Sequence, residues 1–390
     1  MEGRRVAVTG IGVVAPCGIG KDAFWQGLCG PAPEGEHRVF DFQPEQWFDN
    51  PKEARRTDRF SQFALAAATM ALAESGDPGA DPSRAGVMIA TGVGGLSTIE
   101  EQVRVYDGKG PRRVSPFLVP MMMANAAAAG VSMRFGWQGP CENVVTACAA
   151  STHAIANAAR LIAYGRCDAV LAGGSEAAMT KVGIQGFINM TAISSSGISR
   201  PFDVERDGFV IAEGAAVLVL EEWDAAHARG AHINGEILGG ASTADAHHIT
   251  APSPGGAGAI ACIELALAEA GVAAADIGHI NAHGTSTPLN DAAEAVAIEK
   301  VFGTPGPPVT STKGITGHAL GAAGALEAAA VLISMERKLV PPTAGFVQAD
   351  PETHIDIVHG EPRPWEPSPA LSNSFGFGGH NGCLVLGPPA

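Results

Sequence analysis

One cysteine is placed where an α/β protein could use it as a nucleophile. Cys148 lies in NVVTACAAS, residues 143–151, which predicts a buried strand that stops at the cysteine and a buried helix that begins there. The free N–H groups and positive end of that helix favour a thiolate, lowering a pKa that is about 8.5 when unperturbed. Because the helix dipole contributes only about 0.3–1 kcal/mol at an exposed site, a nearby imidazole must supply more of the activation. A small core residue is the other interpretation of this cysteine.

Two histidines stand at comparable turns. His283 ends a short apolar run and is followed by glycine and hydroxyl residues, and His318 comes just ahead of a second apolar helix. α/β proteins assemble catalytic groups at strand ends and helix starts. A single such histidine is more often a hydrogen-bonded structural residue or a cap. Two of them together with Cys148 favour a catalytic site.

Two further segments carry unusual side chains. Glu327 falls inside the second apolar helix, where an unpaired carboxylate would be costly. Lys313 is the nearest cation in sequence, so we expect one buried pair, with either a structural or a catalytic role. Residues 373–381 alternate glycine with Phe375 and Phe377, which indicates either a mobile backbone with bulky gates or a plain hairpin turn.

The elements that must position these residues alternate between strands and helices. Buried strands are predicted by short apolar runs at 6–9, 87–90, 169–172, 215–220, 279–282 and 383–386. The stretches 154–164 and 321–335 are apolar nearly all round, which predicts two buried central helices. The pattern is typical of an α/β protein with sheets covered on both faces. A weak symmetry places the boundary between two halves near Gly230.

Composition narrows the class of protein. Among the 390 residues, 46% are hydrophobic and 17% charged, which predicts a large core or a face covered by another subunit. The net charge of −15 argues against nucleic acid or a membrane surface as a partner. No signal-peptide pattern and no run of about eighteen apolar residues stands out. Seven cysteines without disulfide-like spacing indicate reduced thiols in the cytoplasm.

Two patterns imitate cofactor sites. Residues 10–15, GIGVVA, match the dinucleotide-binding fingerprint, but Pro16 and Gly18 follow where that motif needs a continuing helix. We interpret these residues as a structural turn. His247 and His248 are adjacent, but no third ligand is evident, so we expect no metal.

With these segments in hand, the chain resembles the β-ketoacyl-acyl-carrier-protein synthases of the thiolase superfamily, synthase II type. The resemblance spans nearly the whole chain and rests on VTACAAS, NAHGTSTPLND, STKGITGHALGAAGALEA and SNSFGFGGHNG in the family's order. It implies a layered α-β-α-β-α fold of two pseudo-symmetric halves, which we place at residues 1–230 and 231–390.

The resemblance also implies roles for these residues. Cys148, His283 and His318 would form the catalytic triad, with the Lys313–Glu327 pair beside the histidines. Cys148 would accept an acyl chain from an acyl carrier protein, and the two imidazoles would stabilise the enolate formed as a malonyl thioester loses carbon dioxide. The backbone N–H groups of Cys148 and Phe377 would form the oxyanion hole. The implied chemistry needs no metal and no redox cofactor, since the substrates are carried on phosphopantetheine.

Substrate and partner contacts follow from the same resemblance. Thr285 and Thr287 would touch the phosphopantetheine arm, and Phe375 and Phe377 would line the site, with Phe377 as its gate. The acyl pocket would be floored by Val93 and closed by Leu118 of the partner subunit. Carrier-protein contacts are expected from basic residues, namely Lys52, Arg55, Arg56, Arg112, Arg113, Arg200 and Arg206.

Three alternatives stay open. The chain could be the ketosynthase subunit of a type II polyketide synthase, paired with a chain-length-factor homologue and not with a second copy of itself. A non-catalytic chain-length factor would lack Cys148, and a degradative thiolase would carry a second active-site cysteine, for which Cys383 is out of place. Departures from the family, a shortened loop before Ser199 and His380 in place of threonine, put the pathway in doubt and leave the chemistry intact.

Overall fold

The computed structural model describes residues 3–33 and 35–389. Within them, eleven strands join in one hydrogen-bonded sheet path, ordered β4-β3-β5-β6-β1-β7-β13-β12-β8-β9 with β2 beside β1. The strands of the first half are β1 (Val6–Ala15), β2 (Gly18–Ile19), β3 (Ala85–Ala90), β4 (Cys141–Glu142), β5 (Ala169–Glu176) and β6 (Gly214–Glu222). Those of the second half are β7 (Gly235–Ala244), β8 (His279–Asn281), β9 (Val309–Thr310), β12 (Ala370–Gly376) and β13 (His380–Gly387). Strands β10 (Leu339–Val340) and β11 (Arg363–Pro364) pair separately.

The two halves of the sheet repeat one pairing pattern. In the first, β4, β3 and β5 are parallel, and β6 and β1 then pair antiparallel. In the second, β9, β8 and β12 are parallel, and β13 and β7 then pair antiparallel. Strands β1 and β7 join the halves through two residue pairs only, Ala7 with Glu236 and Val8 with Gly235. The predicted pseudo-symmetry is confirmed; the division at Gly230, which falls between α9 and β7, stays a prediction.

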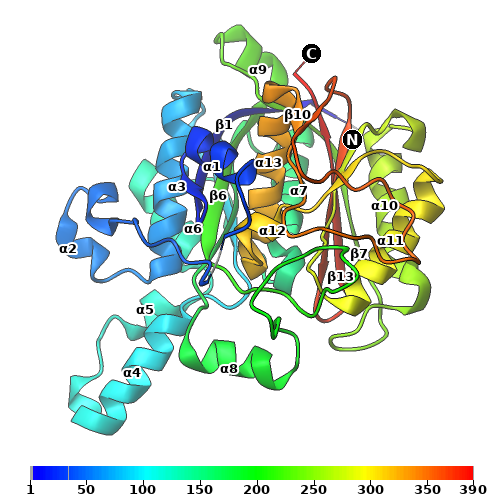
Figure 1. Ribbon diagram of the computed structural model, residues 1–390. Coiled ribbons are helices and arrows are strands. Elements are labelled where there is room, and N and C mark those ends of the chain that lie inside the picture. The colour runs from blue at the N-terminus through cyan, green and yellow to red at the C-terminus, as the bar shows by residue number, and fades with distance from the viewer. Residues whose placement is uncertain (1–2, 34, 390) are drawn as a thin grey trace.

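Helices cover and separate these sheet halves in layers (Figure 1). The central layer holds α7 (Ala150–Ala163) and α13 (Ala323–Arg337). One outer layer packs α3 (Arg59–Ser75) on β1 and β6, and the other packs α10 (Ala257–Ala270) on β7 and β13. The remaining helices are α1 (Lys21–Leu28), α2 (Pro51–Ala54), α4 (Leu96–Lys109), α5 (Leu118–Met122), α6 (Ala126–Phe135), α8 (Lys181–Asn189), α9 (Trp223–Ala228), α11 (Pro288–Phe302) and α12 (Lys313–Thr316). The expected α-β-α-β-α order is confirmed.

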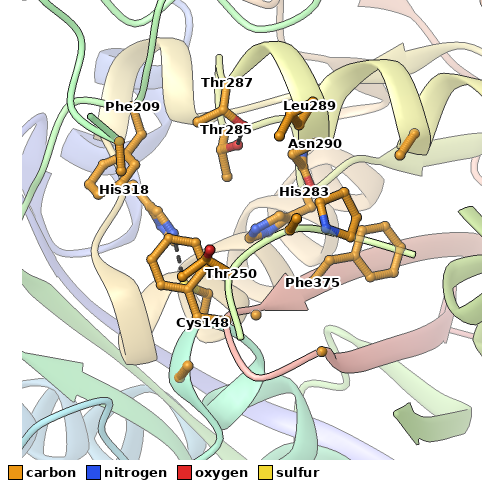
Figure 2. Close-up of a pocket in the computed structure, with 18 of the residues that line it drawn as sticks. Cys148, Phe209, Thr250, His283, Thr285, Thr287, Leu289, Asn290, His318 and Phe375 are labelled. Carbon is orange, nitrogen blue, oxygen red and sulfur yellow. Dashed lines mark hydrogen bonds between the residues drawn. The ribbon is translucent and has the colours of Figure 1, made fainter. Parts of the chain in front are cut away.

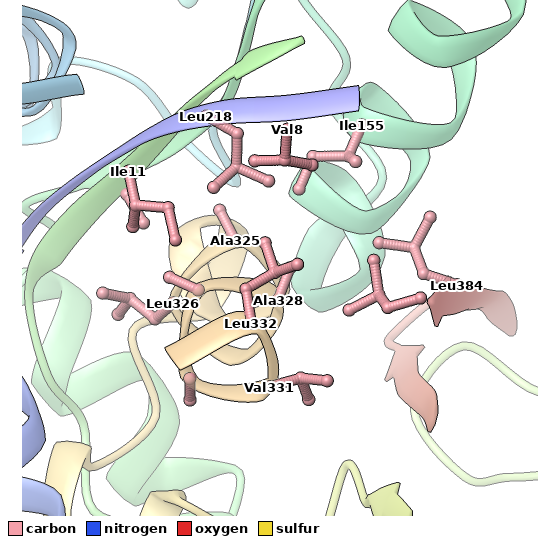
Figure 3. Close-up of a cluster of buried hydrophobic side chains, with 14 of the residues drawn as sticks. Val8, Ile11, Ile155, Leu218, Ala325, Leu326, Ala328, Val331, Leu332 and Leu384 are labelled. Atoms are coloured by element: carbon pink, nitrogen blue, oxygen red, sulfur yellow. The ribbon is translucent and has the colours of Figure 1, made fainter. Parts of the chain in front are cut away.

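Strands and the other central helix cover α13 on every side and α7 over most of its surface; on α7, Asn157 is exposed and Arg160 half-buried. Every residue of α13 from Ala323 to Met335 is buried. Leu326 and Leu332 of this helix belong to the same core cluster as Leu218 of β6 and Ile155 of α7 (Figure 3). A Cβ added at Gly324 would lie 2.0 Å from Thr152 Oγ1 of α7, so glycine permits this close approach. Both predicted central helices are confirmed.

Two sequence interpretations need correction. Residues 10–15 are not a turn but the second half of β1, where an added Cβ at Gly12 would lie 1.8 Å from the Ala67 carbonyl oxygen of α3. The predicted buried strand before Cys148 is only Cys141–Glu142, and Val145 is 50% exposed. Residues 373–381 agree with the hairpin interpretation, since β12 ends at Gly376, β13 begins at His380 and residues 377–379 form the turn between them. None of the described helices is long and apolar enough to span a membrane.

Candidate active site

Cys148 sits at a sharp elbow in front of a central helix. The short 3-10 turn Ala147–Ala149 leads directly into α7, and Ala147 adopts a left-handed φ of 50°. A non-glycine residue pays a conformational penalty for such a φ, so tertiary contacts must hold the elbow. The equivalent turn of the second half, Leu320–Ala322 ahead of α13, also begins with a left-handed residue, Leu320 at φ 44°. Both halves therefore present an elbow to the same cavity.

The electrostatic setting of Cys148 differs from the expectation. Burial raises the pKa of the thiol to about 11, although Lys313 and the backbone N–H groups of Phe377 and Cys148 act in the opposite direction. Burial therefore opposes ionisation of this thiol, and the thiolate expected from the sequence stays a prediction. A helix start cannot offset the loss of water around a side chain that is only 7% exposed.

The two predicted histidines face the cysteine across one cavity (Figure 2). His318 Nε2 lies 3.1 Å from Cys148 Sγ, and the rings of His283 and His318 stand 5.4 Å apart at 83° to each other. Burial and the nearby Lys313 cation lower the pKa of both imidazoles well below the usual 6.5, so both are neutral. The structure therefore brings the three predicted residues together.

Lys313 and Glu327 form the predicted buried ion pair, and the lysine also fixes His283. Lys313 Nζ contacts a Glu327 carboxylate oxygen, donates to the His283 carbonyl oxygen at 2.6 Å, and lies 3.3 Å from His283 Nδ1. An ammonium group can only donate, so His283 Nδ1 accepts and Nε2 carries the ring proton. No such partner holds the other ring, because His318 Nδ1 has no hydrogen-bond partner among the described residues.

The β12–β13 hairpin closes the site opposite the histidines. An added Cβ at Gly376 would lie 3.1 Å from Cys148 N, so this strand runs directly against the elbow. The backbone N–H groups of Phe377 and Cys148 both act on the sulfur. This is the arrangement expected of an oxyanion hole.

Comparisons with known proteins agree with this geometry. The family model described as "Beta-ketoacyl synthase, N-terminal domain" matches residues 31–226, and the corresponding C-terminal domain model matches residues 234–347.

The chain belongs to the β-ketoacyl synthase family.

Two kinds of relative accompany this match. A 3-oxoacyl-[acyl-carrier-protein] synthase 2 from Synechocystis sp. is 43% identical, covering 99% of this chain and 98% of that protein. Two similar structures are the ishigamide ketosynthase/chain length factor, with a TM-score of 0.94 and 32% identity, and a type II PKS acyl-carrier protein in complex with its ketosynthase, with a TM-score of 0.91 and 33% identity. Each covers 100% of both chains. The chain is accordingly a ketosynthase, an acyltransferase that forms carbon–carbon bonds by condensation.

A cavity of about 530 Å³ lies above the Cys148 sulfur of this ketosynthase. Most of the residues expected to contact substrate line it, namely Val93, Thr285, Thr287, Phe375 and Phe377. Thr285 and Thr287 share a hydrogen bond of 2.9 Å between their hydroxyls. Leu118 does not line this cavity; it starts α5 on the outer surface of the same chain. Its predicted role from a partner subunit therefore stays a prediction.

The predicted basic residues fall into two groups. Five are exposed and form two clusters, Lys52, Arg55 and Arg56 in the first and Arg112 and Arg113 in the second. The Arg56 guanidinium lies 4.7 Å from the centre of the Phe117 ring, which places the first cluster beside the chain segment that carries the second. Arg200 pairs with Glu205, and Arg206 pairs with Asp350 with only 6% of its side chain exposed. These ion pairs tie down the loop around residues 200–206, and the carrier-protein contacts expected of Arg200 and Arg206 stay a prediction.

Sequence reasoning missed three buried polar side chains beside the site. Glu294 accepts from the backbone N–H groups of His283 and Gly284. Glu176 accepts from the Thr91 hydroxyl and from the N–H groups of Gly92 and Gly321, and burial raises its pKa to about 7. His153 lies inside α7. A titratable residue within an apolar element was the available signal, the same one that identified Glu327.

Proposed function

We propose that this ketosynthase elongates an acyl chain on an acyl carrier protein by decarboxylating condensation with a malonyl thioester, in fatty acid synthesis. The observation that carries the proposal is the arrangement around Cys148: an imidazole nitrogen 3.1 Å from the sulfur, a second neutral imidazole facing the same space, and two backbone N–H groups on the opposite side. Acyl transfer and enolate stabilisation need this set of groups.

In the first step, Cys148 Sγ attacks the thioester carbonyl of the carrier-bound acyl chain. The carbonyl oxygen becomes an oxyanion that the Phe377 and Cys148 N–H groups stabilise. The carbon–sulfur bond to the phosphopantetheine arm then breaks, leaving an acyl-cysteine. The thiol proton ends on the departing sulfur, and His318 Nε2 is within reach to carry it. This route suits a cysteine that starts as a thiol.

In the second step, the malonyl thioester oxygen accepts hydrogen bonds from His283 and His318. The bond to the carboxylate breaks, carbon dioxide leaves, and the electron pair moves into an enolate that the N–H groups of the two imidazoles stabilise. The enolate carbon attacks the acyl-cysteine carbonyl, forming the new carbon–carbon bond and releasing Cys148 as a thiolate that takes a proton from solvent. Lys313 keeps His283 in the tautomer that this step needs, whereas His318 must donate here after accepting earlier. Its unpartnered Nδ1 leaves both tautomers accessible.

The substrates are proposed to arrive on an acidic carrier protein that docks on the five exposed basic residues. These are the cationic side chains of α2, of the two residues that follow it and of the segment before α5, and on a chain of net charge −15 they offer such a partner a local attraction. A solved relative is described as an acyl-carrier protein in complex with its ketosynthase. The proposed chemistry uses neither a metal nor a redox cofactor.

A second copy of this chain is the proposed partner subunit. Large apolar side chains are at least half exposed on α4, on α6 and on the segment before Cys148, namely Val103, Tyr106, Met133 and Val145. Apolar surface of this kind marks an interface. It would place Leu118 of the partner subunit at the end of the acyl pocket. The cysteines in the described residues are all free, which supports a cytoplasmic location.

The similarity to the ishigamide ketosynthase/chain length factor favours a second candidate, a polyketide ketosynthase that requires a different partner chain. The higher identity to the synthase 2 relative favours the fatty acid assignment. Purified alone, the protein should elongate acyl carrier substrates as a homodimer. Activity that appears only with a co-expressed homologue would establish the second candidate.

Intact-protein mass spectrometry tests the chemistry. Incubation with an acyl carrier substrate should add one acyl group to the wild type and none to Cys148→Ala. His283→Ala should still be acylated but should lose malonyl decarboxylation. Acylation of Cys148→Ala at another residue would overturn the assignment of the nucleophile.

A further inference from the structure

His153 connects two segments that are distant in sequence and meet at the active site. It is 5% exposed and lies on α7, five residues after Cys148. Its Nε2 is 2.9 Å from the Asn381 carbonyl oxygen on β13, and its Nδ1 is 2.8 Å from the Thr146 hydroxyl. A carbonyl oxygen only accepts, so Nε2 carries the ring proton and the Thr146 hydroxyl donates to Nδ1. Burial lowers the pKa of this imidazole, which keeps Nδ1 free to accept.

The two ends of this bridge belong to the segments that carry the two oxyanion donors. Thr146 precedes Cys148 by two residues, and Asn381 follows Phe377 by four. The Cys148 and Phe377 N–H groups are joined covalently only through the long chain between them, so non-covalent contacts must set the distance that separates them. The ring also fits tightly against the hairpin, since an added Cβ at Gly382 would lie 2.9 Å from His153 Nε2.

The elbow needs such an anchor. Ala147 holds a left-handed φ of 50° directly between Thr146 and Cys148, a conformation that costs on the order of 1–3 kcal/mol for a residue without a compensating contact. The His153 imidazole holds the Thr146 hydroxyl. Thr146 and Cys148 flank Ala147 in the sequence, so this bond anchors the residue before the bend. Losing that bond would let the elbow relax and would shift the Cys148 N–H relative to the Phe377 N–H.

We propose that His153 is a positioning residue that sets the separation of the Cys148 and Phe377 N–H groups, and so tunes acyl transfer to Cys148 without acting in decarboxylation. The inference rests on the proposed function. His153 neither lines the cavity nor contacts the Cys148 sulfur; its ring nitrogens bond to Thr146 and Asn381. Decarboxylation uses the imidazoles of His283 and His318. Lys313 holds the first, and the backbone of the second pairs with Val210 and Ala212, so neither depends on this bridge.

The chain offers a matched control one residue away. Thr152 Oγ1 and Ser374 Oγ share a buried hydrogen bond of 2.7 Å, which also joins α7 to the hairpin. This bond ends on β12 and does not reach Thr146. Thr152→Val therefore removes a comparable buried hydrogen bond from the same helix and leaves the elbow anchored.

The test compares two rates in each variant: acylation of Cys148, followed by mass spectrometry, and decarboxylation of malonyl carrier substrate without an acyl primer. A misplaced oxyanion donor costs on the order of 10²-fold, so His153→Leu should lose about that much in acylation while decarboxylation per folded enzyme stays within about threefold. His153→Gln keeps a donor near the Nε2 position and should lose roughly tenfold, about one hydrogen bond. Thr146→Val should resemble His153→Gln.

The ratio of the two rates decides the outcome. Thr152→Val should lower stability and leave the ratio within about threefold of the wild type. The inference is overturned if the ratio is unchanged in both His153→Gln and Thr146→Val, or if Thr152→Val changes it equally. These two milder variants keep the test decisive if His153→Leu does not fold. A wild-type protein that never acylates Cys148 would instead refute the proposed function itself.

Discussion

Replacing Lys313 by methionine tests the most heavily charged point of the site. The substitution gives a side chain one atom shorter and removes the three contacts of Nζ, with Glu327, the His283 carbonyl oxygen and His283 Nδ1. The Glu327 carboxylate is then buried without a cation, and one of its oxygens already lacks a hydrogen-bond partner. Breaking a buried pair in this way costs about 3–5 kcal/mol. Urea unfolding of Lys313→Met should show a loss of that size.

The double variant Lys313→Met/Glu327→Leu separates structure from catalysis. An apolar pair of similar volume often replaces a buried ion pair at little cost. The double variant should therefore be more stable than Lys313→Met, and its loss of unfolding free energy should be far smaller than the sum of the losses in the two single variants. Decarboxylation should fall on the order of 10²–10³-fold in Lys313→Met, because the His283 tautomer is no longer fixed.

Stability should return in the double variant while decarboxylation does not. Losses that simply add would show that the two charges do not interact. Recovery of decarboxylation in the double variant would show that Lys313 serves only to neutralise Glu327. Either result would refute the role that we assign to the lysine.

Further predictions concern the pocket, acid stability and the docking surface. Val93→Phe should fill the end of the cavity and shift preference towards shorter acyl primers, which a ladder of primers measures; an unchanged profile would remove Val93 from the pocket floor. Burial lowers the pKa of His279 to about 3, so its folded form resists protonation and the protein loses stability as the pH falls below about 6.5, by about 1.4 kcal/mol per unit. His279→Phe should lessen the dependence of unfolding free energy on pH between 6 and 4 by that amount, and an equal slope would contradict the assignment. Arg56→Glu should raise KM for carrier-bound substrates and not for pantetheine thioesters, more so at low salt, whereas Arg166→Glu, which carries the same charge change elsewhere on the surface, should alter neither.

The local sequence pattern predicted the helices and strands that are buried in the core. The central helices and the strand end that precedes His283 were predicted because apolar periodicity reports burial directly. The same rule failed at Val145, since an exposed apolar residue has the same sequence signal as one in the core. It also failed at Gly12, where glycine serves close packing of α3 and not a turn.

The partners of buried polar groups were predictable only where sequence supplied both members. Glu327 and Lys313 lie fourteen residues apart and each would be penalised alone, so the pair could be inferred. His153 is satisfied by Asn381, which lies 228 residues further along the chain. That contact depends on how β13 is placed against α7, and no local pattern encodes it.

The paired elbows at Ala147 and Leu320 bear on how this catalyst could be re-engineered. Because Ala147 and Leu320 adopt similar left-handed φ angles, each half places a bend of the same kind beside one cavity, with Cys148 after the first bend and His318 before the second. A side chain beside one bend can then be exchanged while the backbone path, and the side chains beside the other bend, are kept.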